Sequence, residues 1–424
     1  MASMKDKHGR PVVVVTGMGV VTSLGQGKDE NWAKLTAGQS GIHTITRFPI
    51  DGLRTTIAGT VDFVPFENAP DLTTKMAALA GEEAVAEARI GEAGAFPGPL
   101  FLGMPPVEIE WPQRQDLARA SGKSSDITYS DLLKGAAAKD FAAMQKRFLF
   151  GSVGDQLADR FGTRGAPISI STACATGATA IQLAVEAIRR GETEAALVVG
   201  ADGSANQESL VRFSLLSALS TRNGEPAAAA RPFAKDRDGF VMAEGAGALV
   251  LESYEHAQAR GATILGVVEG CGEMADSFHR TRSSPDGAPI IGCIRNALED
   301  AGVTPADVQY VNAHGTSTPE NDKMEYVGLS SVFGDHLSNI AVSSNKSMIG
   351  HTLSAAGAIE AVFTLMTIRS GVIPPTINQT EADPAIKLDL VPNVARKAKV
   401  TRAISNSFGF GGQNVCLVLA AEPV

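Results

Sequence analysis

The sequence predicts an α/β protein built from two similar halves, because one pattern occurs twice along its 424 residues. In each copy an apolar run stops at Ser or Thr, a Ser-rich turn follows, and a helix of small and apolar residues ends in a basic residue and glycine. The copies are PISISTACATGATAIQLAVEAIRRGE, from Pro167, and IAVSSNKSMIGHTLSAAGAIEAVFTLMTIRSG, from Ile340. Such a change of periodicity predicts a strand followed by a helix. Continuous apolar strands that alternate with helices favour a buried, mixed sheet.

Further strands complete each half. First strands are expected at Val12–Thr16 and Ile264–Val268, the former ending before Gly17 and Gly19, and a later strand follows each copy, ALVVGAD around Val198 and VCLVLAAE around Val415. Single hydrophobic cores stop growing at roughly 250–300 residues, so a chain of this length is expected to divide. We place the halves at 1–260 and 261–424.

The region from Gly91 to Arg147 departs from this pattern. It mixes prolines, glycines and isolated polar runs, with helix-like stretches near Asp131–Lys146. Long irregular segments inside a compact domain are usually functional or disordered. We interpret 91–147 as an insertion that forms an ordered subdomain.

Composition excludes several classes of protein. The net charge of -9 argues against a nucleic-acid or anionic-membrane surface. The four cysteines show no CxxC or Cys/His ligand spacing, so neither a zinc site nor a disulfide framework is expected, and a reducing cytoplasm fits best. No window approaches the ~18 apolar residues of a membrane helix.

Three residues are candidates for chemistry. Cys174 precedes a predicted buried helix, whose N-terminus would lower the thiol pKa and favour a thiolate. His314 ends the predicted strand VQYVNA, and His351 lies in the turn that mirrors the Cys174 segment. The repeat should bring Cys174 and His351 to a common centre. Taken singly, each could instead be an ordinary buried residue.

The segment SNSFGFGGQN, Ser405 to Asn414, places glycines around Phe408 and Phe410. Glycines let backbone N–H groups approach a substrate, as an oxyanion hole requires, although a glycine-rich loop before a strand can also be a simple hairpin.

Five blocks together are specific: STACATGA, RPFAKDRDGFVMAEGAGALVLE, NAHGTSTPENDKME, SSNKSMIGHTLSAAGA and SNSFGFGGQN, in this order from Ser171 to Asn414. They resemble the signature blocks of the β-ketoacyl-[acyl-carrier-protein] synthase family, of the elongating, synthase II-like type, over nearly the whole chain except Gly91–Arg147. The resemblance implies the thiolase fold, with duplicated αβαβα layered halves and mixed five-stranded sheets, and a homodimer.

The resemblance also implies roles for single residues. Cys174 would be the acylated nucleophile, and His314 and His351 would bind the malonyl thioester carbonyl through Nε2–H, with each Nδ1 accepting a backbone hydrogen bond. Lys346 and Glu325 would support the site, Phe408 would act as a gate, and the backbone N–H groups of Phe410 and Cys174 would form the oxyanion hole. Departures from the usual pattern fall at Ala234, Ala243, Glu320, Asn321 and Gln413.

The implied activity is that of a 3-oxoacyl-[acyl-carrier-protein] synthase, an acyltransferase of fatty acid elongation that uses no cofactor and no metal. It would join the acyl group on Cys174 to malonyl-carrier protein by decarboxylative Claisen condensation, and the acidic carrier protein would dock on Lys75, Lys139 and Arg222, although Ser217 stands where a basic residue is common. Alternatives are a polyketide-type ketosynthase and a non-catalytic chain-length partner subunit. The unusual stretch Met104–Trp111 is expected to line the acyl pocket and change its preference.

Overall fold

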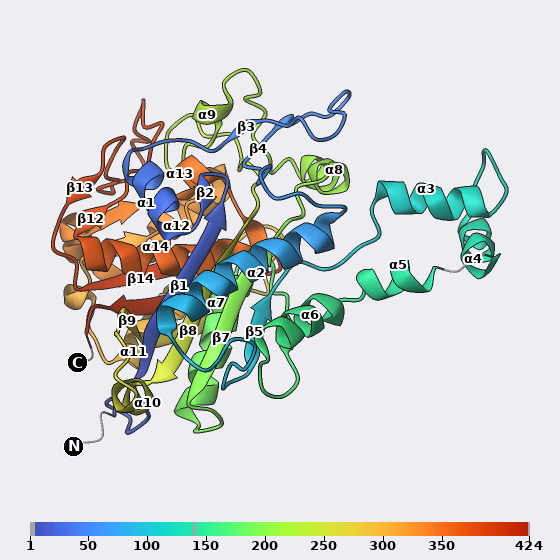
Figure 1. Cartoon of the computed structure of the whole chain (residues 1–424). Helices are drawn as coiled ribbons and strands as arrows, with labels where there is room; N and C mark the ends of the chain where they lie inside the picture. Colours follow the sequence, from blue (N-terminus) through green and yellow to red (C-terminus); the bar gives the residue numbers. More distant parts are fainter. Residues whose placement is uncertain (1–4, 139–140, 423–424) are drawn as a thin grey trace.

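A computed structural model describes residues 5–138 and 141–422. Its centre is a mixed eleven-stranded sheet with the order β6-β5-β7-β8-β1-β9-β15-β14-β10-β11, and β2 pairs with β1 beside this path (Figure 1). The strands of the first half are β1 (Val13–Thr22), β5 (Leu100–Gly103), β6 (Ile168–Ile170), β7 (Ala195–Asp202) and β8 (Gly245–Ser253). Those of the second half are β9 (Gly266–Ala275), β10 (Tyr310–Asn312), β11 (Ala341–Ser343), β14 (Arg402–Phe408) and β15 (Gln413–Ala420).

The two halves of the sheet have the same topology. In each, three strands are parallel (β6-β5-β7 and β11-β10-β14) and the next strand, β8 or β15, runs antiparallel to both of its neighbours. The predicted duplication with mixed five-stranded sheets is therefore confirmed. One detail was wrong: the counterpart of the strand around Val198 is β14, and the strand around Val415 corresponds to β8. The division at 260/261 stays a prediction.

Helices form three layers around the sheet. The buried helices α7 (Thr176–Arg189) and α14 (Ala356–Ser370) pack against each other and against strands of both halves. On the outside, α2 (Ala69–Ala88) covers β1, β7 and β8, while α11 (Ala288–Ala301), backed by α12 (Pro319–Phe333), covers β9 and β15. This is the αβαβα layering that the sequence resemblance implied.

The first strand is longer than predicted. It continues through Gly17 and Gly19 to Thr22, because α2 crosses it at very short range. A Cβ added to either glycine would lie 2.0 Å from a backbone oxygen of α2, that of Ala84 or of Ala80. The glycines therefore permit close packing of the helix on the strand and do not interrupt it.

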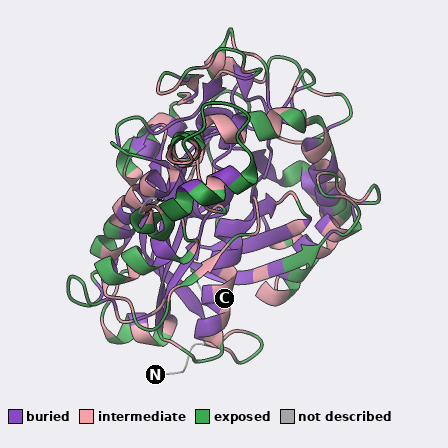
Figure 2. Cartoon of the chain, turned by 90° about the vertical axis from the view of Figure 1, so that its right-hand side faces the viewer, coloured by how far each residue is buried: buried purple, intermediate pink, exposed green. Residues whose placement is uncertain are grey.

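The insertion forms an arm of three helices, α3 (Trp111–Ala120), α4 (Tyr129–Ala138) and α5 (Ala142–Arg147), which extends away from the body (Figure 1). The helices expected near 131–146 are present, and α4 packs against α3, but the bounds 91–147 were too wide, because β5 inside them is a strand of the main sheet. No described residue of 111–147 belongs to a hydrophobic cluster. Figure 2 looks onto this side and shows the buried residues concentrated in the strands and inner helices.

The remaining elements are shorter connections. They are the helices α1 (Lys28–Thr36), α6 (Gly151–Phe161), α8 (Gln207–Leu215), α9 (Pro226–Ala229), α10 (Tyr254–Ala259) and α13 (Lys346–Ile349), the strands β2 (Gly25–Gln26), β3 (His43–Thr44), β4 (Ile57–Ala58), β12 (Val372–Ile373) and β13 (Arg396–Lys397), and 3₁₀ turns at Pro305–Asp307, Gly334–Asn339 and Leu353–Ala355. Within 5–138 and 141–422, no helix combines the length and apolar character needed to cross a bilayer.

Candidate active site

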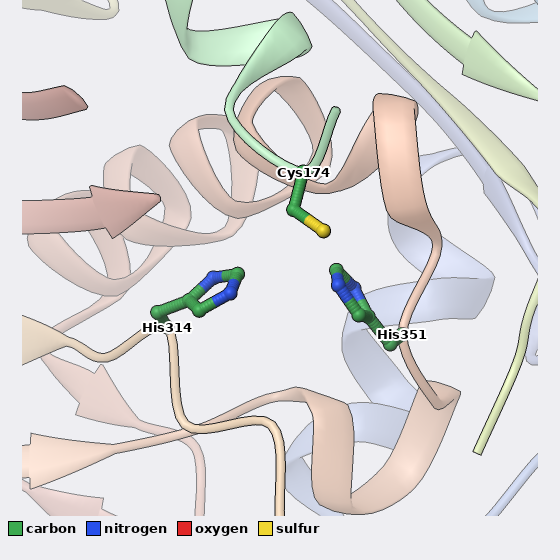
Figure 3. Close-up of side chains that lie close together, drawn as sticks. All are labelled: Cys174, His314 and His351. Carbon is green, nitrogen blue, oxygen red and sulfur yellow. The ribbon is translucent and has the colours of Figure 1, made fainter. Parts of the chain in front are cut away.

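The three candidate residues meet at one point. Cys174 comes from the turn between β6 and α7, His314 from the end of β10, and His351 from the turn after α13, and their side chains face one another (Figure 3). Their sulfur and nitrogen atoms lie within 4.8 Å of one another, and all three residues are buried. A thiol and two imidazoles are donor types found in zinc sites, and this is the one such group of three in the part of the chain that the structure describes.

A strained turn positions Cys174. The preceding Ala173 has a φ of 49°, in the left-handed region that costs a non-glycine residue energy. The Thr172 N–H donates to Oγ1 of Thr176 at 2.7 Å, and α7 begins only at Thr176. Cys174 therefore precedes the helix, and its side chain projects toward His314 and His351 (Figure 3).

The prediction of a lowered thiol pKa is wrong. Burial raises the pKa of Cys174 to about 11, because a thiolate loses its hydration there. The Phe410 backbone N–H, which donates to the sulfur, and the charge of Lys346 both oppose this rise without cancelling it. The thiol is consequently protonated near neutral pH.

The backbone on either side of His314 is held by Glu325 on α12. The two carboxylate oxygens accept hydrogen bonds from the N–H groups of His314 and Gly315, each at 2.8 Å, and one also accepts from the Asn406 side chain at 3.1 Å. Burial raises the pKa of Glu325 to about 7. The expectation that His314 Nδ1 accepts a backbone hydrogen bond was wrong, since this atom has no partner among the described residues.

His351 is held as if it were part of a strand. Its N–H donates to the Val241 carbonyl at 2.7 Å, and its carbonyl accepts from the Ala243 N–H at 2.9 Å. Its Nδ1 accepts a hydrogen bond from the Leu353 N–H at 3.3 Å, which confirms the prediction for this residue and assigns its proton to Nε2. The block RPFAKDRDGFVMAEGAG thus serves to hold His351.

Aromatic rings fix the two imidazoles. The rings of His314 and His351 meet edge to face, with centroids 5.3 Å apart, and Phe408 packs on His314 with centroids 5.8 Å apart. Phe240 packs on His351 at 5.3 Å. Phe240 was missed as a site residue, although it lies in one of the five quoted blocks.

Lys346 acts on the site through its charge. It is buried and forms an ion pair with Glu360 on α14, a partner that the sequence did not reveal; burial raises the pKa of Glu360 to about 7. Burial, and after it the positive charge of Lys346, lowers the pKa of both histidines well below its usual value. Both imidazoles are therefore neutral at pH 7.

Two cavities reach the nucleophile from different directions, and Cys174, Phe213, Leu353 and Phe410 line both. The first, of about 440 Å³, is also lined by the stretch 104–110 from the start of the insertion. The second, of about 530 Å³, also contains His314 and His351. Three departures from the family pattern lie on these walls: Gln413 lines the first cavity, and Glu320 and Asn321 line the second.

Two of the predicted docking residues, Lys75 and Arg222, lie outside both cavities. Lys75 forms an ion pair with Asp71 at 2.8 Å, and Arg222 forms one with Asp236 at 2.9 Å. Lys139 falls outside the described residues. Their role in docking stays a prediction.

Comparison with protein families identifies both halves of the chain. Residues 10–85 and 118–257 match "Beta-ketoacyl synthase, N-terminal domain", and residues 265–380 match "Beta-ketoacyl synthase, C-terminal domain". The unmatched stretch 86–117 contains the start of the insertion, but the match resumes at 118, well before Arg147.

Relatives and solved structures agree with this assignment. The chain is 38% identical to 3-oxoacyl-[acyl-carrier-protein] synthase 2 of Coxiella burnetii (96% of this chain, 98% of the relative) and 39% identical to that of Vibrio harveyi (96% and 97%). Among structures, it resembles a β-ketoacyl synthase from Burkholderia phymatum (TM-score 0.82, 32% identity, 97% of this chain and 100% of the other) and the type II polyketide complex AntDE:AntF, an acyl-carrier protein with its hexaketide-bound ketosynthase (TM-score 0.86, 32%, 97% and 100%). The chain belongs to the β-ketoacyl synthase family of acyltransferase enzymes.

Proposed function

We propose that this protein is a 3-oxoacyl-[acyl-carrier-protein] synthase that elongates an acyl group held on Cys174. The observation that carries the proposal is a buried thiol beside two neutral imidazoles, at the junction of two cavities. One cavity can hold the acyl chain on the nucleophile, and the other can admit the second thioester next to the histidines.

The first step is acyl transfer. Because the Cys174 thiol is protonated at neutral pH, its proton must leave as the sulfur attacks the thioester carbon. The proton on His351 already occupies Nε2, so His314 is the acceptor. The backbone N–H groups of Phe410 and Cys174 stabilise the oxyanion. The carrier thiol then leaves with the proton from His314, and a Cys174 thioester remains.

The second step is condensation. Decarboxylation of the malonyl thioester breaks a C–C bond, releases CO2 and leaves its electron pair in an enolate. The two imidazole N–H groups stabilise the enolate oxygen, and donors of this kind contribute about 10²–10³ in rate. The enolate carbon attacks the acyl carbonyl, the bond to Cys174 breaks, the departing sulfur takes up a proton from solvent to restore the thiol, and the product is a 3-ketoacyl-carrier protein. Phe408, packed on His314, acts as the gate between the steps.

The test separates the nucleophile from the decarboxylation site. Cys174→Ala should abolish condensation and acyl labelling without unfolding the protein. Cys174→Gln should retain malonyl decarboxylation, because its amide mimics the acylated thiol. Mass spectrometry of the wild-type chain after incubation with a mixed acyl-carrier-protein pool identifies the acyl group trapped on Cys174. Condensation by Cys174→Ala would contradict the proposal.

A polyketide-type ketosynthase is the second candidate, favoured by the likeness to the AntDE:AntF ketosynthase, whose structure holds a hexaketide. Product analysis with malonyl-carrier protein distinguishes the two: single extension of a saturated chain supports the first function, whereas repeated extension without reduction supports the second. The presence of Cys174, His314 and His351 argues against a non-catalytic chain-length subunit.

The partner of the reaction is proposed to be an acidic acyl carrier protein. Lys75 and Arg222 can contribute to its docking once their intramolecular carboxylate partners exchange. Charge reversal at both positions should raise KM for carrier-protein substrates steeply at low salt and little at high salt, since screened surface charges lose their effect. A change in KM that is independent of salt would argue against this patch.

We also propose a homodimer. The end strand β6 is paired on one side only, and its Ile168 is exposed. The arm carries exposed Trp111, Tyr129 and Leu133, side chains that a partner subunit would cover. Light scattering after gel filtration should give twice the chain mass, and serine at these three arm positions should shift the protein toward the monomer. A monomeric wild-type protein would overturn this proposal.

A further inference from the structure

The second cavity carries two positive charges at its exposed end. It is lined at its buried end by Cys174 and both histidines, and elsewhere by Arg280 and Arg282. Both arginines are exposed and belong to the loop between β9 and α11. The same cavity therefore contains the buried reacting side chains and two exposed, positively charged residues.

These arginines differ from most arginines of the chain in having no carboxylate partner. Neither Arg280 nor Arg282 makes a side-chain hydrogen bond or ion pair with any residue that the structure describes, whereas Arg212 and Arg222 on nearby segments are both paired with carboxylates. A guanidinium without an internal partner is free to bind an external anion. Ser217, which lines the same cavity, adds no charge of its own.

The loop is nevertheless held in a defined place. Asp276 accepts hydrogen bonds from the N–H groups of Phe278 at 2.9 Å and Ser284 at 2.7 Å, so its carboxylate is already used within the loop. The Arg280 carbonyl accepts from the Gly411 N–H at 2.8 Å. That contact ties the loop to the glycine-rich segment that also supplies Phe410 to the nucleophile.

The anion that fits is one attached to the entering substrate. Guanidinium groups bind phosphate oxygens through paired, charge-assisted hydrogen bonds. A carrier-protein substrate reaches a buried nucleophile through its phosphopantetheine arm, which bears one phosphodiester at the end remote from the thioester. Glu320, on the wall of the same cavity, is the one acidic side chain there besides Asp276 among the described residues. Its single negative charge is smaller than the combined positive charge of the two arginines, so the cavity wall still favours an anion.

We propose that Arg280 and Arg282 bind the phosphodiester of the phosphopantetheine arm and so help to select carrier-bound thioesters. This inference rests on the proposed function and deepens it, because it names the part of the substrate that these residues recognise. Recognition of the arm adds to any docking of the carrier-protein surface.

The test compares two small thioesters with the same acyl group, one on phosphopantetheine and one on pantetheine without phosphate. Acylation of Cys174 is followed by mass spectrometry for the full-length wild-type chain, for Arg280→Ala/Arg282→Ala, and for Arg295→Ala. Arg295 is a matched control, since it is exposed, makes no side-chain hydrogen bond or ion pair within the described chain, and lines neither cavity.

The measured quantity is the ratio of kcat/KM for the phosphorylated arm to that for the phosphate-free arm. The double variant should lower this ratio about 10- to 100-fold, as expected when charge-assisted hydrogen bonds are lost, and Arg295→Ala should leave it unchanged. An equal loss for both thioesters would overturn the proposal, because the arginines would then act on the loop or on the pantetheine itself. A loss seen only with intact carrier protein would also overturn it, in favour of contact with the protein surface. Failure of every thioester to acylate wild-type Cys174 would instead refute the proposed function.

Discussion

The reactivity of Cys174 toward an alkylating agent such as iodoacetamide should rise steeply with pH. The thiolate is the reactive form, and a pKa of about 11 leaves about one molecule in a thousand ionised at pH 8. An ordinary exposed thiol with a pKa of about 8.5 is roughly one quarter ionised at that pH. Protonation alone should therefore slow alkylation of Cys174 by roughly 200-fold. The rate should increase about tenfold for each pH unit between 8 and 10, without a plateau.

The assay is mass spectrometry of intact protein and of peptides at each pH, with circular dichroism to show that the fold persists. Cys174→Ala provides the blank, and the pKa of Cys271 is raised further, to about 12, so labelling there should lag behind. A plateau with a midpoint below pH 8 would refute the reasoning, because it would mean that the helix N-terminus and Lys346 outweigh burial. Acyl transfer would then need no proton acceptor.

Three other predictions follow from the same site. His351→Ala should reduce malonyl decarboxylation by about 10²–10³-fold while Cys174 is still acylated, whereas His314→Ala should impair both steps. Decarboxylation is measured by CO2 release and acylation by radiolabelled acyl transfer. Equal effects of the two variants on both steps would contradict this division of roles. Lys346→Met leaves the Glu360 carboxylate buried without its partner and should lower the free energy of unfolding in urea by about 3–5 kcal/mol, most of which a second change, Glu360→Leu, should restore. Replacement of 104–111 by a glycine-rich stretch should shift the preferred acyl chain length in kcat/KM across a panel of saturated chains, since each methylene contributes ~1–3 kcal/mol; an unchanged optimum would show that this wall does not select the chain.

The sequence predicted the arrangement better than the energetics. The duplicated strand–turn–helix pattern was enough to bring Cys174 and His351 together, because α7 and α14, the helices that follow the two turns, pack against each other. The sequence predicted a lowered pKa for the Cys174 thiol, whereas burial raises it. The sequence shows where a helix begins, but it does not show how completely the surrounding chain excludes water. The Glu360 partner of Lys346 was missed for a similar reason: it lies within an otherwise apolar helix, and only the fold brings the two charges together.

The insertion also shows that sequence predicts local structure better than long-range packing. Local propensity correctly indicated helices near 131–146, because helix formation depends mainly on neighbouring residues. Whether those helices pack into an interior depends on residues far away in the chain, and here α4 packs against α3 while the large apolar side chains of Trp111, Tyr129 and Leu133 stay exposed. Gly17 and Gly19 were predicted to end the first strand, because the sequence does not show that α2 approaches this strand closely.

The antiparallel pairing of β1 with β9 has a consequence for protein engineering. Only Val13–Val15 and Gly266–Val268 form this seam, yet the nucleophile lies on one side of it and both histidines lie on the other. A chimera that crosses over between the end of β8 and the start of β9 would exchange both histidines, Glu325, the Lys346–Glu360 pair and the Arg280–Arg282 loop together, while keeping the nucleophile, the acyl wall formed by 104–110 and the stretch 240–243 that holds His351. Matching these two three-residue segments is the first requirement for such recombinants to assemble a complete reaction chamber.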